Sequence, residues 1–275
     1  MVAGAIRPTV ALIQSTPPDE AGYVSFGTYP LGIKTAMSLS RIKILQINDQ
    51  TVDMPTDIKA HISEFDAIVE ARERIGTLPI SEPSELDNQV ASYVVERIPN
   101  GATLQIGVGS ISNAIGYALE NHKDLGIHTE MYTESMMHLT QKGAVTNAAK
   151  TLHPGKSVLG LAGGSKKLYQ FLHKNSNVFV KDIGWVNDPF IIAQNHKMVS
   201  INAALAIDLL GQVSSESIGF AQYSGTGGQV DFVRGAQRAE GGMSFITLAS
   251  TIEKKDGTRL SKITLTHPTG TAVTT

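Results

Sequence analysis

The sequence predicts an α/β protein with two domains, and three observations support this. The chain has 275 residues, 41% of them hydrophobic, which is enough to bury one large core or two modest ones. Short apolar runs alternate with segments of helical spacing, which favours a parallel or mixed sheet covered by helices. Residues 77–87, TLPISEPSELD, contain two prolines and several acids, a composition typical of an interdomain connection. We therefore expect one domain over residues 1–84 and a second over residues 85–275.

Composition and charge exclude several classes of protein. The chain has 23 basic and 25 acidic residues in mixed order, so we expect no broad cationic face for nucleic acid or an anionic membrane. It contains no cysteine, which removes disulfides, thiolate metal sites and cysteine nucleophiles. No run approaches the roughly 20 apolar residues of a spanning helix, and the N-terminus is too broken for a signal peptide. We predict a soluble, cytoplasmic protein with neither nucleic-acid nor membrane partners.

The first part of the chain is predicted to consist of strands with intervening helices. Thr9 to Gln14 has the pattern of a buried strand, and the loop that follows contains Pro17, Pro18 and Gly22, which forbid both a helix and a central strand. Ile42 to Asn48 alternates as a second strand does.

The second part begins with a predicted helix from Asp87 to Ile98, with Asp87 as N-cap. A strand, a glycine turn and a helix follow, an arrangement that places free backbone N–H groups where an anion can bind. These three elements are Ala102–Ile106, Gly107–Ser110 and Ile111–Leu119, and further strands are expected at Gly126–Met131, Ser157–Leu161, Asn177–Val180 and Met198–Ile201.

Two glycine-rich loops are candidate ligand sites. The first comprises Gly107, Val108, Gly109, Ser110 and Ile111. It lacks the third glycine of a dinucleotide fingerprint and has no acid at the expected distance, which counts against a dinucleotide-dependent oxidoreductase. The loop alone leaves open phosphate contact and a simple strand-to-helix turn.

The second loop has three glycines in four positions, Gly225, Gly227 and Gly228. Without Cβ atoms, main chain here can approach a ligand closely, although a simple mobile loop has the same composition. Arg234 could bind a phosphate or neutralise Asp231, and position alone does not separate these two roles.

Between the loops, residues 128–138 hold two carboxylates and two imidazoles. Their spacing does not match the helical two-histidine zinc pattern, and no Asp or Cys completes a ligand set, so we predict no metal. Glu130, at the end of a predicted strand, could act as a nucleophile toward an activated acyl group. The alternative is a solvated loop acid.

Taken together, five segments resemble, in order and spacing, the acetyl-CoA hydrolase/transferase family, especially its 4-hydroxybutyrate CoA-transferase-like branch. The segments are ALIQSTPPDEAGYVSFG (11–27), ATLQIGVGSISNAI (102–115), DLGIHTEM (124–131), VNDPFIIAQNHKMVSINAALAIDLLGQV (186–213) and YSGTGGQVDFVRGA (223–236). Several motifs in one order are far more specific than any one alone. The resemblance implies two open-sheet α/β domains of the CoA-transferase type, the first incomplete.

The resemblance also implies a ping-pong transfer of coenzyme A (CoA) between an acyl-CoA and a small carboxylic acid such as acetate, butyrate or 4-hydroxybutyrate. Glu130 matches the catalytic glutamate, which would form a glutamyl-CoA thioester, and Gly225 matches a donor to the thioester oxyanion. Gly107 to Ile111, Asn202, Gly225, Gly227 and Gly228 would bind CoA, while Pro17, Pro18, Gly22 and Tyr23 would line the acyl side. No cofactor beyond CoA itself is implied, and a homodimer or larger assembly is expected.

The sequence departs from this family at several points. Relatives begin before Met1 and continue past Thr275, so we expect a truncated chain whose first sheet leaves an edge or apolar face exposed. Thr133-Glu134-Ser135 replaces a Ser-Asp-Gly of many relatives and should add bulk beside Glu130, and Met243 replaces a Lys. Two alternatives therefore stay open: an acyl-CoA hydrolase, which lets water resolve the thioester, and an inactive CoA-binding remnant.

Overall fold

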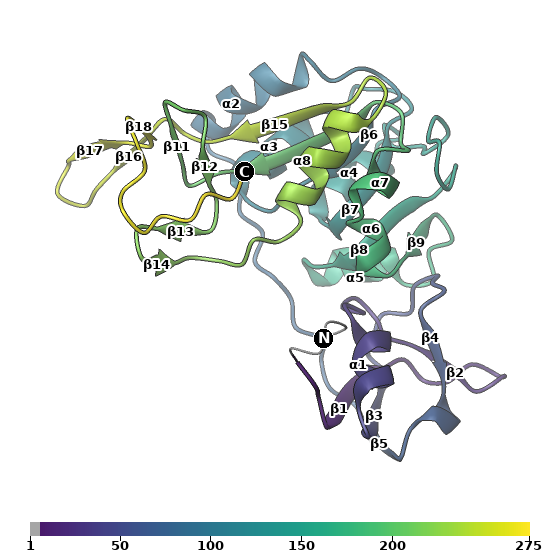
Figure 1. The fold of residues 1–275 in the computed structure, drawn as a ribbon. Helices are drawn as coiled ribbons and strands as arrows, with labels where there is room; N and C mark the ends of the chain where they lie inside the picture. The colour runs from purple at the N-terminus through teal and green to yellow at the C-terminus, as the bar shows by residue number, and fades with distance from the viewer. Residues whose placement is uncertain (1–5) are drawn as a thin grey trace.

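The computed structural model describes residues 6–275 and shows two lobes, each built on its own parallel sheet (Figure 1). The predicted α/β class with two open sheets is confirmed. The lobes meet through main-chain hydrogen bonds, among them Ala162 N–H to Thr28 O at 2.9 Å and Leu78 N–H to Gly164 O at 2.9 Å. Leu78 lies in the connection between the sheets, so this segment is docked on the second lobe.

The first lobe contains a three-stranded parallel sheet in the order β1-β3-β5. Its elements are β1 (Val10–Ser15), β2 (Tyr23–Ser25), α1 (Ile33–Leu39), β3 (Ile42–Asn48), β4 (Lys59–His61), η1 (Ile62–Glu64) and β5 (Ala67–Ala71). Along β1 burial alternates, with Ala11 and Ile13 buried and Leu12 78% exposed, because one face of the sheet is covered and the other is not. The expected exposed apolar face is therefore present.

The second lobe contains a six-stranded parallel sheet in the order β15-β10-β6-β7-β8-β9. Its strands are β6 (Thr103–Ile106), β7 (Gly126–Tyr132), β8 (Ser157–Ala162), β9 (Val178–Val180), β10 (Met198–Ala203) and β15 (Met243–Thr247). All five strands predicted for residues 102–201 are confirmed. Every residue of β8 is buried, as expected of a parallel strand covered on both faces.

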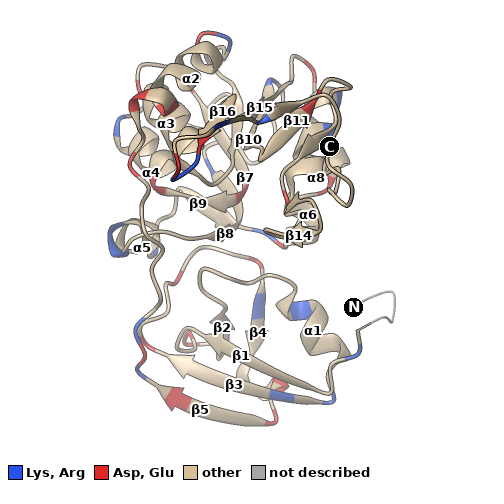
Figure 2. Cartoon of the chain, turned by 90° about the vertical axis from the view of Figure 1, so that its left-hand side faces the viewer, with Lys and Arg blue, Asp and Glu red and all other residues tan. Residues whose placement is uncertain are grey.

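Helices cover both faces of this sheet (Figures 1 and 2). One layer comprises α2 (Glu85–Val95), α3 (Ser110–Ala118), α4 (Glu134–Gln141) and α5 (Lys166–Leu172), and the other α6 (Ile183–Val186), α7 (Pro189–Ile192) and α8 (Gln229–Arg238). The predicted N-cap Asp87 is wrong. Ser84 caps α2 because its hydroxyl accepts Asp87 N–H at 3.2 Å while Asp87 accepts Ser84 N–H at 2.8 Å, a reciprocal capping box in which Asp87 is the third helical residue.

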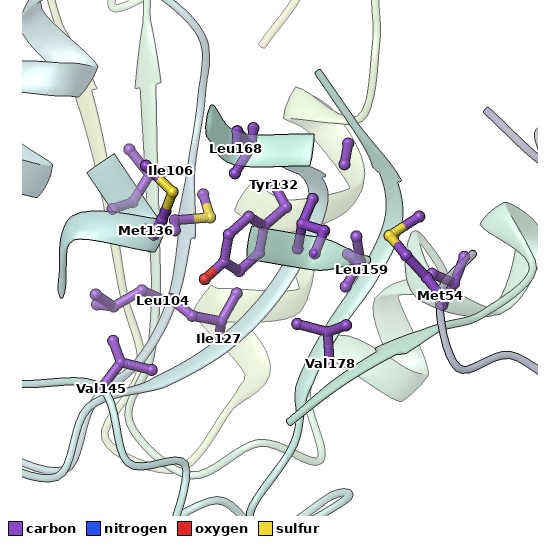
Figure 3. Close-up of a cluster of buried hydrophobic side chains, with 14 of the residues drawn as sticks. Met54, Leu104, Ile106, Ile127, Tyr132, Met136, Val145, Leu159, Leu168 and Val178 are labelled. Carbon is purple, nitrogen blue, oxygen red and sulfur yellow. The ribbon is translucent and has the colours of Figure 1, made fainter. Parts of the chain in front are cut away.

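A large part of the core lies between this sheet and the α3–α5 layer, where apolar side chains from strands and helices interdigitate (Figure 3), and a smaller cluster lies on the α6–α8 face. Tyr132 at the centre of the larger part is fully buried, and its hydroxyl is satisfied by Thr140 Oγ1 at 3.0 Å. Burial raises the pKa of this phenol far above its usual value, so it stays neutral.

The remaining strands form small peripheral sheets. They are β11 (Ala206–Asp208), β12 (Val213–Ser214), β13 (Ser217–Ile218), β14 (Ala221–Gln222), β16 (Thr251–Glu253), β17 (Arg259–Ser261) and β18 (Ile263–Thr264). Acidic and basic residues are interspersed along the chain in both lobes (Figure 2). Over residues 6–275, no helix has both the length and the apolar character needed to cross a membrane.

Candidate active site

Glu130 lies near the carboxyl end of β7, a central strand of the large sheet. Asn187 Nδ2 donates a hydrogen bond of 2.6 Å to Glu130 Oε2. Asn187 is the C-cap of α6 and immediately precedes Asp188, which caps α7, so its position is fixed from both sides. A short bond from a neutral amide orients the carboxylate without adding a positive charge beside it.

The second glycine loop packs directly against this carboxylate. A Cβ on Gly228 would lie 2.1 Å from Glu130 Oε2 and 2.6 Å from Asn187 Nδ2, and one on Gly227 would lie 4.0 Å from Glu130 Oε1. Gly227 also has a φ of +54°, a conformation that favours glycine. Gly225 is exposed, and a Cβ added there would have no atom within 4 Å. Close approach to Glu130 thus requires a glycine at position 228, and the backbone conformation favours one at position 227.

The first glycine loop lies on the neighbouring strand. Gly107 directly follows β6, and Gly109 is the N-cap of α3 with a φ of +131°. A Cβ on Gly107 would lie 3.2 Å from Asn202 Oδ1, so this glycine is needed where β6 and β10 end side by side. Ser110 and Ile111 are the first two residues of α3.

Asn202 lies at the end of β10 in a buried amide network. Gln105 Nε2 donates to Asn202 Oδ1 at 3.0 Å, and Asn202 Nδ2 donates to Gln105 Oε1 at 3.1 Å and to Ser200 Oγ at 2.9 Å. The Asn202 side chain is therefore committed to Gln105, and the pair stabilises the floor between β6 and β10.

A cavity of about 210 Å³ joins these features. Its lining includes Glu130, Asn202, Gly107, Val108, Gly225, Gly227 and Gly228 among the predicted site residues, and Gln105, Thr129, Met131, Thr226, Gln229 and Phe232 among others. Gly109, Ser110 and Ile111 do not line it, because the chain turns into α3 after Val108. The structure thus brings together seven of the predicted residues and leaves three at its edge.

Several other predicted residues lie away from this cavity. Pro17, Pro18, Gly22 and Tyr23 do not line it. The antiparallel β2–β4 pair brings Tyr23 opposite His61, with ring centroids 5.3 Å apart. Residues 133–135 were expected to add bulk beside Glu130, but the side chains of Glu134 and Ser135 pack elsewhere. Ser135 fills the space beside Gly116, and Glu134 Oε1 accepts Ser165 N–H at 2.6 Å.

Asp231 and Arg234 lie on α8 beyond the loop. Burial raises the pKa of Asp231, and the positive charge of Arg234 opposes that shift. Arg234 therefore interacts electrostatically with Asp231, as one of its two predicted roles requires. Among the residues that the structure describes, no group of three His, Asp or Glu side chains could hold a metal ion.

Sequence reasoning missed Asn187 and Gln105. Asn187 stands in the VNDPF stretch, 57 residues after Glu130, and no local pattern marks its amide as a carboxylate partner. The only signal was a polar residue at a helix end inside one of the five segments described above.

The fold and this site define an α/β protein of the CoA-transferase type. RipA from Yersinia pestis superposes with a TM-score of 0.89 at 36% identity, covering 97% of this chain and 60% of that one. A 4-hydroxybutyrate CoA-transferase from Porphyromonas gingivalis superposes with a TM-score of 0.86 at 37% identity, covering 98% and 64%.

Sequence comparison gives the family. Residues 164–275 match the model of the acetyl-CoA hydrolase/transferase C-terminal domain. The chain is 42% identical over 266 residues to 4-hydroxybutyrate coenzyme A transferase of Clostridium kluyveri, covering 97% of this chain and 61% of the relative. It is 36% identical over 278 residues to butyryl-CoA:acetate CoA-transferase of Anaerostipes caccae, covering 96% and 61%. The chain belongs to the acetyl-CoA hydrolase/transferase family, and it spans about three fifths of the length of these curated relatives.

Proposed function

We propose that this chain carries the active site of a CoA-transferase that moves CoA between an acyl-CoA and a small carboxylic acid. One observation carries the proposal: the Glu130 carboxylate projects into a cavity, is held by Asn187 and is closely packed by Gly228. Among the described residues no ion pair within 4 Å involves this carboxylate, which suits a group that acts as a nucleophile.

In the first half-reaction, a Glu130 oxygen attacks the acyl-CoA carbonyl. The carbon–sulfur bond breaks and CoA thiolate leaves with the electron pair, which gives an acyl-glutamyl anhydride. The thiolate then attacks the glutamyl carbonyl, the carboxylate of the acyl group leaves, and a glutamyl-CoA thioester forms. Each step exchanges one acyl bond for another, so neither ATP nor a metal is needed.

In the second half-reaction, an incoming carboxylate attacks the glutamyl thioester and releases CoA thiolate. The thiolate attacks the new acyl carbon of the anhydride, which frees Glu130 and yields the new acyl-CoA. Every step passes through a tetrahedral oxyanion. Backbone N–H groups of residues 225–228 are suited to bind it, and one such donor stabilises a transition state by about 3 kcal/mol.

The other roles follow from position. Gly107 and Val108 line the cavity wall and could contact CoA, with Asn202 and Gln105 beneath them. We propose no cofactor beyond the substrate CoA, a cytoplasmic location and a homo-oligomeric assembly. Transfer is favoured over hydrolysis because the relatives at 36–42% identity are named CoA-transferases, whereas the acetyl-CoA hydrolase of Candida albicans is 27% identical.

The test is mass spectrometry after incubation with acetyl-CoA and borohydride, which reduces a glutamyl thioester to an alcohol. A mass loss of about 14 Da on the peptide that contains Glu130 is expected, since covalent catalysis leaves this carboxyl activated. Glu130→Gln should abolish the change, and the matched variant Glu134→Gln should retain it, because Glu134 lies outside the cavity.

A second arm separates the alternatives. Without borohydride, a thioester discharged by acetate or butyrate to form new acyl-CoA supports the transferase. Discharge at the same rate in buffer alone would make the protein a hydrolase. A chain that binds CoA but never forms the thioester would be a remnant, and the proposal would be wrong.

A further inference from the structure

His128 lies two residues before Glu130 on β7, so their side chains leave the same face of the sheet. The imidazole is fully buried. Its Nε2 lies 2.9 Å from the carbonyl oxygen of Val186, and Val186 directly precedes Asn187, the hydrogen-bond partner of Glu130. His128 therefore touches the peptide that carries this partner.

The same ring also packs against aromatic side chains of α6 and α8. Its centroid lies 5.6 Å from that of Trp185 on α6 and 6.1 Å from that of Phe232 on α8. Phe232 lines the cavity, and α8 begins directly after Gly228, which lies against Glu130. One buried imidazole thus spans the two segments that flank the carboxylate.

The chemistry of the ring fixes its hydrogen-bonding role. Burial, followed by the nearby Lys150 charge, lowers the pKa of His128 to about 3, so the ring is neutral. Because a carbonyl only accepts, Nε2 must carry the proton and donate it to Val186 O. Nδ1 is then an acceptor, and it has no partner among the described residues.

A buried acceptor without a partner is costly, and an apolar side chain of similar size would avoid that cost. What the imidazole adds is one hydrogen bond, from its Nε2 to the carbonyl oxygen of Val186. That carbonyl belongs to the last residue of α6, a helix of four residues, and the last carbonyls of a helix have no partner within it. The bond therefore fixes the orientation of the peptide between Val186 and Asn187.

We propose that His128 is a positioning residue: by binding the Val186 carbonyl it holds the turn that carries Asn187, and through Asn187 it orients the Glu130 carboxylate. The catalytic consequence rests on the proposed function, whereas the positioning itself does not. Among the described residues the His128 side chain hydrogen-bonds to Val186 and not to Glu130, and it does not line the cavity, so we expect its effect to pass through the turn.

The first measurement is the ¹⁵N-edited NMR signal of the Asn187 side-chain amide, assigned by its loss in Asn187→Ala. A carboxylate acceptor shifts one of the two amide protons downfield. We expect this shift in the parent protein, and its loss in Glu130→Ala, His128→Phe and His128→Asn. His128→Gln should retain it, because a glutamine Nε2–H can reach the carbonyl whereas the shorter asparagine amide cannot.

The second measurement is the rate of glutamyl-CoA thioester formation at saturating acyl-CoA. His128→Phe and His128→Asn should lower the rate by about 10²-fold with unchanged half-saturation, as expected for a nucleophile displaced by about 1 Å. His128→Gln should restore most of it. The matched control is His122→Phe, which removes a similar bond, His122 Nε2 to Ile98 O at 3.0 Å, far from the cavity lining; it should change neither readout.

An unchanged Asn187 signal in both His128→Phe and His128→Asn would overturn the proposal, as would equal loss in His128→Gln. If His128→Phe fails to fold, the comparison of the Asn and Gln variants decides. If the parent protein forms no thioester, the proposed function fails, while the amide signal still decides whether His128 positions Asn187.

Discussion

Replacing Gly228 with alanine tests the packing of the glycine loop on Glu130. The backbone of Gly228, with φ −95° and ψ 9°, is accessible to alanine, so no backbone strain is added. The new Cβ would lie 2.1 Å from Glu130 Oε2, about 1.3 Å short of the 3.4 Å at which ordinary contact begins. It would also lie 2.6 Å from Asn187 Nδ2, and because both clashing atoms end flexible side chains, these can rotate away and the fold survives.

The expected cost therefore falls on the chemistry. Moving a nucleophile by about 1 Å lowers a rate by about 10²-fold, which corresponds to about 2.7 kcal/mol of activation free energy. The melting temperature should change little, because alanine also lowers the entropy of the unfolded chain, by about 0.4–1 kcal/mol.

The assay is single-turnover formation of the glutamyl-CoA thioester, followed by intact-protein mass spectrometry alongside thermal unfolding. Gly76→Ala is the matched control, since a Cβ there meets nothing within 4 Å. A Gly228→Ala protein that forms thioester at the parent rate would refute the argument that Glu130 works in the observed position. A protein that is inactive because it no longer folds would refute the argument that the carboxylate yields first.

Three further changes probe the site and its supports. Asn187→Ala removes the 2.6 Å bond to Glu130 and should slow thioester formation by about 10- to 10²-fold at unchanged CoA affinity, and parent-like kinetics would contradict the role of the amide. Burial lowers the pKa of Lys150 from 10.5 to about 7, so between these values the unfolded chain holds a proton that the folded chain lacks, and stability should rise with pH. Urea denaturation inside and below this window should show the rise in the parent and not in Lys150→Met. Gly235→Ala places a Cβ 2.4 Å from Ile192 Cγ2, and calorimetry should show a loss of about 1–3 kcal/mol from overpacking, whereas a gain would mean that the α7–α8 contact adapts freely.

The large sheet could be predicted from the sequence because its strands are short apolar runs covered on both faces. In that sheet β8 extends one residue beyond the prediction and β15 was not predicted, whereas β3 of the small sheet has the predicted bounds, Ile42 to Asn48. The peripheral strands between Ala206 and Thr264 were not predicted, because they have two or three residues each and many are exposed. Such pairs have no periodicity of their own, and tertiary context decides them. The division of the chain after residue 84 stays a prediction.

The site was predictable only in part, for a related reason. Glu130 and the two glycine loops each lie in a local pattern that a sequence displays. The contacts of Asn187 with Glu130 and of Gln105 with Asn202 join residues 57 and 97 positions apart, and nothing in the local sequence of either amide marks its partner. The position of residues 17–23 away from the cavity has the same origin, because the pairing of β2 with β4 determines where that loop points.

The register of the large sheet explains why residues distant in sequence meet at one cavity. Ile201 pairs with Ile106, so Asn202 is level with Gly107, and Leu104 pairs with Ile127, so Gly107 is level with Glu130. The strand order β10-β6-β7 places these three positions in one row at the carboxyl ends of parallel strands, where α/β sheets bind their ligands. The packing of α8 over β10 and β15 then places the second glycine loop, which directly precedes α8, beside these three positions. A one-residue slip of β7 would turn Glu130 to the other face of the sheet, so the sheet register, set by its apolar core, is what determines which carboxylate faces the loop.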